Sequence, residues 1–166
     1  NIRIERVLVH VGGTADKLEK GFKLIGIITG KKPVKTKSTK RIPSLGVSPG
    51  LEVGAVVTIR KNTHQILQRL LAARENKIRK KAVADNHFSF GIKEYIEIPG
   101  MEYQRDIGIA GVDVTIVFAR PGRRVALRKM RKTNIPKRQV VTKGEIIKFM
   151  EENFKTQFKW QQAIGK

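Results

Sequence analysis

The chain has 166 residues, of which 35 are Lys or Arg and 14 are Asp or Glu, so its formal net charge at pH 7 is +21. Such a surplus is typical of proteins that bind a polyanion, because each neutralised phosphate releases condensed counterions. The lack of cysteine excludes disulfides, thiolate metal sites and a cysteine nucleophile. There is no run of about 18 apolar residues and no signal peptide before the first predicted strand, so we expect neither a membrane span nor export.

The first part of the chain predicts three strands and one helix. Residues 2–11 carry β-branched side chains at alternate positions, which is typical of a strand. Thr14 can cap a helix whose apolar residues recur at helical spacing, and Gly30 suits the C-terminal cap of that helix. The next segments alternate again on either side of a loop rich in proline and glycine. The two strands are expected at residues 34–42 and 52–60, and the loop between them at residues 43–50.

The second part of the chain predicts two helices and two further strands. Thr63 begins a helix with an apolar stripe that extends to Ile78. Thr142 and Glu145 have the spacing of a capping box, which begins a short amphipathic helix that includes Phe154. Between the two helices, alternating apolar residues predict strands at residues 87–97 and 112–120.

These elements predict an α+β fold. We expect helices on one face of a largely antiparallel five-stranded sheet, with the other face free for RNA. No internal repeat and no break in composition marks a second domain. We therefore expect a single RNA-binding domain over residues 1–158, followed by a C-terminal tail, residues 159–166, that need not be ordered.

Basic residues are concentrated in three segments. Residues 31–41 contain six Lys or Arg and no acid, and residues 120–138 contain nine and no acid. A solvated surface normally mixes the two signs, so we expect these two segments to contact phosphates. Residues 69–81 contain six basic residues and Glu75, and a plain solvated surface explains them as well as an RNA contact does.

The first basic segment predicts a row of cations. Side chains two residues apart on a strand project from the same face about 6.6 Å apart. An RNA backbone can lie against such a row without any base being read. Phe88 and Phe90 also have strand spacing, but we expect them in the core rather than as stacking platforms for bases. The residues expected to form the row are Lys35, Lys37, Thr39 and Arg41.

Signals for catalysis are weak. Residues 26–32 resemble a phosphate loop, but only three residues separate the two glycines, and Lys32 stands where Ser or Thr would bind magnesium. The three histidines lie far apart, without the spacing of metal ligands. We therefore expect no enzyme, no metal and no cofactor. Residues 94–113 contain five acids and one base, a composition that disfavours contact with RNA and fits either a contact with a basic protein or a plain solvated loop.

The order of several segments resembles a known family. The segments TGKKPVKTKSTKRI, LGVSPG and GLEVGAVVTIRK are similar to the core signature of the L-five family of large-subunit ribosomal proteins. NHFSFGIKEYIEIPGMEYQRDIGIAGVDVTIVFARPGRRV and IPKRQVVTKGE are similar to its archaeal and eukaryotic branch, whose eukaryotic member is called L-eleven. The resemblance covers roughly residues 2–158.

The resemblance implies a cytoplasmic, ribosome-bound protein whose sheet binds 5S rRNA in the central protuberance of the large subunit. It further implies contacts with 23S- or 28S-type rRNA and with other central-protuberance proteins. The acidic stretch would face a protein of the small-subunit head, with Glu97, Glu102 and Asp106 as candidates for that contact. The loop between the second and third strands would approach the peptidyl-site tRNA through Ser44, Leu45, Gly46, Val47 and Ser48.

The charge pattern and the resemblance together give one set of candidate RNA-binding residues. The chain departs from the family at Lys31, where Gln is usual, and in the tRNA-facing loop, where Ser and Pro replace basic residues. The candidates are His10, Lys31, Lys32, Lys35, Lys37, Thr39, Arg41, Arg123, Arg124, Arg128, Lys129, Arg131, Lys132, Lys137 and Arg138.

Three other classes of protein compete with this interpretation. A general RNA-binding or RNA-chaperone protein outside the ribosome would share the charge but would not prefer 5S rRNA. A membrane-surface protein needs a basic amphipathic helix with bulky apolar exposure, whereas the basic segments lie mostly on predicted strands and loops. An RNA-modifying enzyme needs a nucleophile, a metal set or a cofactor loop, and the sequence offers none of these convincingly.

Overall fold

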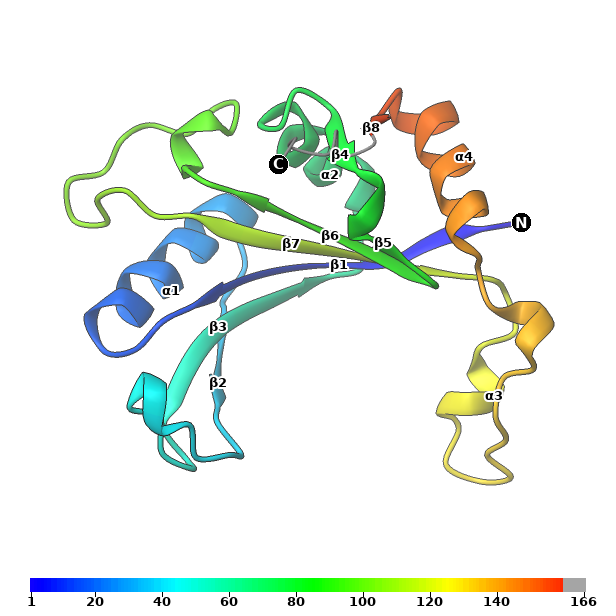
Figure 1. Ribbon diagram of the computed structural model, residues 1–166, viewed down its shortest axis with the longest axis horizontal. Coiled ribbons are helices and arrows are strands. Elements are labelled where there is room, and N and C mark those ends of the chain that lie inside the picture. The colour runs from blue at the N-terminus through cyan, green and yellow to red at the C-terminus, as the bar shows by residue number, and fades with distance from the viewer. Residues whose placement is uncertain (160–166) are drawn as a thin grey trace, which may run out of the picture.

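The structure is a computed structural model and describes residues 1–159. Its sheet has six strands in the order β2-β3-β1-β7-β6-β5, with every adjacent pair antiparallel (Figure 1). The predicted α+β class is confirmed, and the additional strand is a two-residue edge strand too short to produce an alternating pattern. The strands are β1 Arg3–Gly12, β2 Val34–Lys37, β3 Glu52–Ile59, β5 Val83–Ala84, β6 His87–Ile92 and β7 Val112–Ala119.

Three helices cover one face of this sheet: α1 Asp16–Thr29, α2 Thr63–Ala72 and α4 Lys143–Phe154 (Figure 1). The core lies between these helices and the sheet, because alternate strand residues point toward the helices. Val9 of β1, for example, is fully buried and pairs with Val57 of β3 and Val114 of β7. In the described part of the chain, no helix is long and apolar enough to cross a bilayer.

The first helix begins one residue later than expected. Thr14 does not cap it, because the chain turns sharply at Ala15, which has φ 47°, and the carbonyl of Ala15 accepts hydrogen bonds from the N–H groups of Leu18 and Glu19. The expected C-terminal cap is confirmed. Gly30 has φ 62°, in the left-handed region that favours glycine, and its N–H donates to the carbonyl of Gly26 at 2.9 Å.

The second helix is shorter than expected. It ends at Ala72, and Glu75 and Asn76 then adopt positive φ values that reverse the chain. Ile78 is buried as predicted, but it lies on the short strand β4 Lys77–Arg79 rather than on the helix. This strand pairs in parallel with β8 Gln157–Lys159, a partner so distant in sequence that no local pattern indicates it.

The segment 87–97 is only partly a strand. Strand β6 ends at Ile92 and a 3-10 turn, η3 Tyr95–Glu97, follows. As a result Tyr95 is fully buried, whereas Ile96, which continued alternation from Phe88 would place in the core, is exposed. The hydroxyl of Tyr95 accepts a hydrogen bond from the N–H of Gln104 at 2.9 Å, which satisfies its polar end.

The final helix begins as predicted. Thr142 and Glu145 form the capping box, in which the N–H of Thr142 donates to Oε2 of Glu145 at 3.0 Å. Of the predicted tail, Lys159 is the last residue of β8, and residues 160–166 lie outside the described residues. The division into one domain and a tail stays a prediction.

Candidate nucleic-acid interface

The face of the sheet opposite α1, α2 and α4 is here called the open face, because no helix of the described residues packs over it (Figure 1). Its side chains alternate with the buried ones and are mostly small or polar. His10 and Thr115 lie side by side there, with Nε2 and Oγ1 3.4 Å apart. A Cβ atom at Gly54 would stand 2.7 Å from Oγ1 of Thr36, so glycine at this position lets β2 lie close to β3. Two charged residues also lie on this face, because Arg6 pairs with Val117 and alternates with the buried Val7, and Asp113 pairs with His10.

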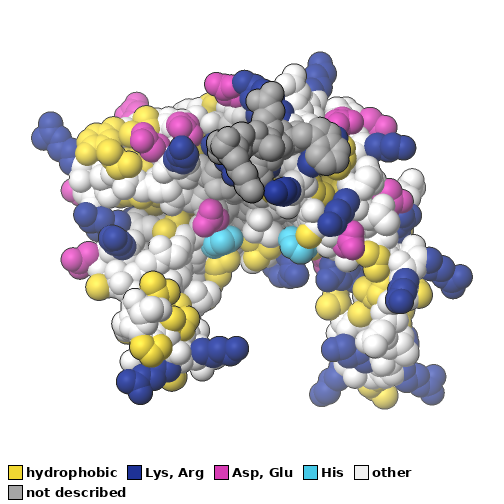
Figure 2. Space-filling model, viewed as in Figure 1, with side chains coloured by type: hydrophobic (Ala, Val, Ile, Leu, Met, Phe, Trp, Pro, Cys, Tyr) yellow, Lys and Arg dark blue, Asp and Glu magenta, His cyan; other side chains and the backbone are white. Residues whose placement is uncertain are grey.

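Two projections border the open face (Figure 2). The first arm, residues 38–51, extends from the β2–β3 hairpin, and the second arm, residues 121–139, follows β7. Figure 1 shows both arms on the side away from α1, α2 and α4. Figure 2 shows Lys and Arg side chains at both tips, with a hollow between the arms. The molecule is therefore an arch whose two feet carry Lys and Arg side chains.

Backbone hydrogen bonds shape the first arm. The N–H of Ser38 donates to the carbonyl of Leu51, and the N–H of Gly50 donates to that of Ser38, both at 2.8 Å. A 3-10 turn, η1 Pro43–Leu45, forms its tip, and Gly46 follows with φ 64°. In the expected tRNA-facing loop, Leu45 is 69% exposed, but Val47 is buried and its side chain cannot meet a partner. The other three residues of that loop, Ser44, Gly46 and Ser48, are exposed.

The second arm is rich in cations. It contains one turn of helix, α3 Arg124–Leu127, and a 3-10 turn, η4 Lys137–Gln139. Near its tip Nε of Arg128 donates to the carbonyl of Arg131 at 2.9 Å, which closes the loop. Seven of the predicted RNA-binding side chains are exposed on this arm, and they are Arg124, Arg128, Lys129, Arg131, Lys132, Lys137 and Arg138.

Two ion pairs fix the root of the second arm. Arg120 pairs with Glu145 of α4, and Arg123 pairs with Glu5 of β1. The Thr142 backbone N–H and the Arg120 guanidinium lower the pKa of Glu145 below its ordinary value. Arg123 was among the predicted RNA-binding residues, yet its guanidinium is only about one third exposed and is held by a carboxylate. Its role in the fold is to orient the arm.

The predicted row of cations does not form on the open face. Strand β2 ends at Lys37, so Thr39 and Arg41 belong to the first arm. Nζ of Lys35 lies 2.9 Å from Oε2 of Glu52 and 6.0 Å from the ring centre of Phe22 in α1, which places it on the helix side. The Glu52 hydrogen bond and charge raise the pKa of Lys35 above its ordinary value.

Lys35 and Lys37 share one side of β2, as two-residue alternation predicts, but that side faces the first helix. Both lysines line one hollow together with Leu18 and Glu19 of α1. A register shift between Thr36 and Lys37 marks the end of the regular pairing of β2 with β3. The residue of β2 that reaches the open face is Thr36, which lines a second hollow with His10.

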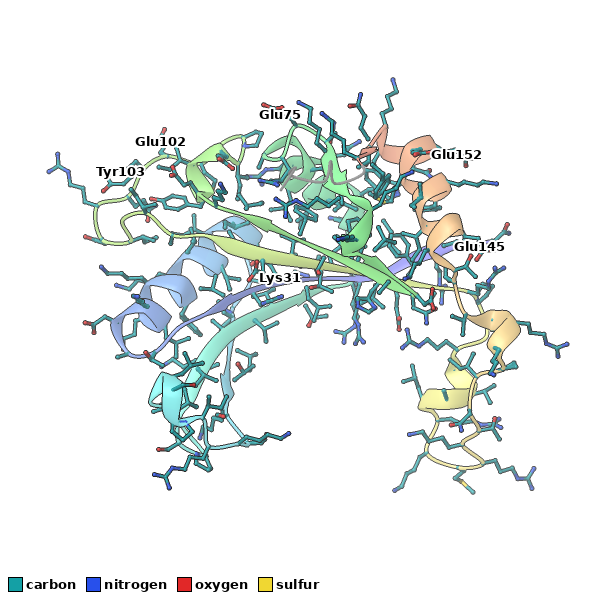
Figure 3. All side chains as sticks on the ribbon, in the orientation of Figure 1. Lys31, Glu75, Glu102, Tyr103, Glu145 and Glu152 are labelled. Carbon is teal, nitrogen blue, oxygen red and sulfur yellow. The ribbon has the colours of Figure 1, made fainter. Side chains whose placement is uncertain are left out.

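The remaining candidates lie away from the arch. Lys31 and Lys32 are exposed at the turn between α1 and β2, and Lys31 lies at the level of the sheet, distant from the arm tips (Figure 3). Glu97, Glu102 and Asp106 are exposed on the segment between β6 and β7. Glu102 and the 56% exposed Tyr103 lie on the helix side of the sheet, away from the open face, whereas Asp113 at the end of the acidic stretch pairs with His10 on that face (Figure 3).

The sequence reasoning missed the floor of the arch. Thr58 and Thr115 are half-buried at positions that pair with the open-face residue Leu8. The signal was present, because each of them alternates with a predicted inward residue of the same strand. Attention to charge alone overlooked these uncharged hydroxyls.

Comparisons with known proteins agree with the resemblance noted in the sequence. Residues 52–149 match the model of the C-terminus of the ribosomal L5 protein family. The chain is 39% identical over 160 residues to the large ribosomal subunit protein uL5 of Nanoarchaeum equitans, a match that covers 94% of this chain and 95% of that protein. The chain belongs to the L5 family of large-subunit ribosomal proteins. The uL5 proteins of Sulfolobus acidocaldarius and Methanosphaera stadtmanae are 42% and 37% identical, over 89% and 88% of the chain and 84% and 88% of their own lengths.

Membership of the L5 family settles the class of the protein. It is a structural constituent of the large ribosomal subunit, bound to the ribosome in the cytoplasm, and it is not an enzyme. The arch of the open face and its two arms is therefore a surface of a ribosomal protein. Its positive feet suit contact with ribosomal RNA.

Proposed function

We propose that the protein binds 5S rRNA in the central protuberance and that the RNA lies against the open face between the two arms. The observation that carries this proposal is the distribution of charge. Lys and Arg side chains stand at the tips of both arms, on either side of the hollow between them, and Arg6 adds a cation on the floor. Cations placed around a hollow in this way hold a phosphate backbone in place without reading its bases.

The floor adds a means of recognising RNA. His10, Thr58 and Thr115 present hydrogen-bonding groups on a shallow surface. A-form RNA exposes 2′-hydroxyl groups along a wide, shallow minor groove, and proteins recognise it mainly by shape and by contacts with these hydroxyls and with phosphates. A helical segment of 5S rRNA that turns its minor groove toward the floor fits these groups.

Competition between two RNAs tests this proposal. The full chain is titrated into labelled 5S rRNA while unlabelled 5S rRNA or tRNA competes. We expect 5S rRNA to compete far better, and we expect affinity to fall about 10³- to 10⁵-fold between 50 and 200 mM salt if 6 to 10 phosphates are neutralised. Equal competition by tRNA would instead identify a general RNA-binding protein, and a salt-independent affinity would rule out the electrostatic model.

The acidic stretch is proposed to meet a basic protein of the small-subunit head. Its carboxylates are exposed on the helix side, together with Tyr103 and Ile109, which are 56% and 74% exposed. Acids rimming apolar side chains favour a protein partner over RNA. Changing Glu97, Glu102 and Asp106 to Lys should weaken association of the two subunits and leave 5S rRNA affinity unchanged or higher. A collapse of 5S binding in the folded variant would show that the stretch is an RNA site.

The tip of the first arm is proposed to approach the peptidyl-site tRNA. The arm carries only two cations, Lys40 and Arg41, and its 3-10 turn offers Ser44, Leu45 and backbone groups. Such a contact depends on shape more than on charge. A tRNA crosslink obtained from a photoreactive residue at position 45 in assembled ribosomes, but not from one at position 20, would support it.

A further inference from the structure

Part of one strand edge in the sheet has no partner. Strand β5 pairs only with His87 and Phe88 of β6, whereas β6 continues to Ile92. Strand β4 would prolong β5 along that edge if the chain ran straight, but the turn η2 Lys80–Ala82 directs it away to pair with β8. Within residues 1–159, the edge of β6 from Ser89 to Ile92 is therefore left unpaired.

A hollow of about 450 Å³, here called the slot, occupies the space between β4 and this edge. Its apolar lining comes from Ile78, Phe90 and Ile92. Ile78 and Ile92 are buried and Phe90 is half-buried, so the lining belongs to the rigid core of the protein. The slot thus combines an unpaired strand edge with an apolar floor.

The rim of the slot is positive. Its charged lining residues are Arg74, Lys77, Arg79, Lys93 and Asp113. Lys77 pairs with Glu75, but no ion pair joins Arg79 or Lys93 to an acid anywhere in the described chain. Nε of Arg74 is buried without a hydrogen-bond partner, and a buried donor left in this way is unfavourable. An anionic partner would complement this rim.

We propose that the slot binds an extended acidic segment of another protein, which pairs with β6 as an added strand. An unpaired edge is a template for such addition, and alternate side chains of the added strand then fill pockets on the host. The open edge spans four residues, or about 13 Å. A nucleic acid lacks the alternating N–H and C=O groups that a strand edge requires, and apolar side chains line the slot. The slot lies at the sheet edge, and the proposal does not rest on the proposed binding of 5S rRNA.

A designed peptide tests the strand addition. The probe is a fluorescent heptapeptide in which Glu or Asp alternates with Val or Ile. Its control has the same sequence but is N-methylated at alternate residues, which removes the ladder donors and keeps every charge. We expect the unmodified probe to bind the full chain at least about tenfold more tightly. Equal affinity of the two peptides would overturn the proposal.

A pair of variants tests the place of binding. Arg79→Gln with Lys93→Gln removes two cations from the rim, and Lys61→Gln with Lys143→Gln removes the same charge elsewhere. With circular dichroism showing that both variants fold, we expect the rim pair to lose at least fivefold in peptide affinity and the control pair less than twofold. Equal losses of affinity in the two variants would show that the peptide is held only by the general positive charge of the protein, which would overturn the proposal. Oligouridine that displaces the probe and itself depends on Arg79 and Lys93 would make the slot an RNA site instead.

Discussion

The first arm and the second arm border the same open face, but different forces hold them. Backbone hydrogen bonds and the buried side chain of Val47 shape the first arm, which carries only Lys40 and Arg41 as charges. Ion pairs of Arg120 and Arg123 fix the root of the second arm, whose exposed surface is crowded with cations.

The two arms therefore differ in what salt can change: the shape of the first arm does not depend on charge, whereas the surface of the second arm does. Backbone hydrogen bonds do not depend on ionic strength, so the first arm keeps its form in salt. Exposed cations and partly exposed ion pairs are screened by salt, so the proposed binding mode assigns most of the salt-dependent attraction for RNA to the second arm. In that proposal the first arm positions the RNA and the second attracts it.

The largest effect is expected at the tip of the second arm. Changing Lys129, Arg131 and Lys132 to Gln should reduce the slope of log affinity against log salt for 5S rRNA by about 3. Changing Lys40 and Arg41 of the first arm to Gln should reduce the slope by less than about 2. If filter-binding titrations gave the same change in slope per removed charge in both variants, the two arms would not differ in their contribution to the attraction.

A substitution on the open face between the arms should weaken the binding of RNA to both arms. Thr58→Glu places a carboxylate on the floor of the arch, where it would repel phosphates and occupy space. We expect 5S rRNA affinity to fall about tenfold or more, since several kcal/mol can oppose like charges brought together. Thr14→Glu, on the exposed turn before α1, is the matched control and should change the affinity much less. Equal effects in the two variants would show that RNA does not reach the floor.

Loss of Glu145 should loosen the second arm alone. Glu145→Ala removes the capping-box carboxylate and the partner of Arg120, and we expect the free energy of unfolding at pH 7 to fall by about 1 kcal/mol. The folded-state pKa of Glu145 lies below its ordinary value of 4.5, so its contribution is present above that pH and is lost as pH falls through the folded pKa.

Denaturant titrations at several pH values measure this effect. The difference between the natural chain and the variant should shrink as pH decreases below about 4.5. Glu151→Ala, on the exposed side of the same helix, is the control and should cost less. Limited proteolysis should cut the second arm faster in Glu145→Ala, and an unchanged cleavage rate would show that the ion pair does not hold the arm.

The smallest effect is expected at the root of the first arm. Lys35→Gln breaks the pair with Glu52, but both side chains are more than one third exposed, and solvent screens such pairs. Because backbone hydrogen bonds hold this arm, the melting temperature should change by less than about 2 °C. The 5S rRNA affinity should also stay nearly constant, since Lys35 lies on the helix side. A large loss of 5S rRNA affinity would show that Lys35 contacts the RNA.

The sequence was sufficient for those parts of the fold that local patterns determine. Alternation in residues 52–60 and 112–120 predicted central strands, because each has one face buried along most of its length. The capping box at Thr142 and the glycine cap at Gly30 were also predictable, since each depends on residues within a single helical turn.

The parts that the sequence did not reveal depend on distant partners. The strand of Ile78 exists because residues 157–159 pair with it, and the short strand at residues 83–84 exists because β6 lies beside it. The cation row failed because β2 ends at Lys37, before Thr39 and Arg41, and because Lys35 and Lys37 face α1 rather than the open face. Charge indicated the class of partner and the second arm, but only the tertiary structure shows that both arms border one face.

The parallel pairing of β4 with β8 also determines when this part of the fold can form during synthesis. Its two strands are separated by about 80 residues, and Ile78 pairs with Phe158 at the C-terminal end of the described chain. At about 5 to 20 residues per second, a ribosome needs on the order of 4 to 16 s to make the intervening chain. Throughout that interval β4 has no partner strand, and it must wait longer while β8 itself clears the exit tunnel. This contact of a ribosomal protein can therefore close only after an existing ribosome has made and released residues 157–159.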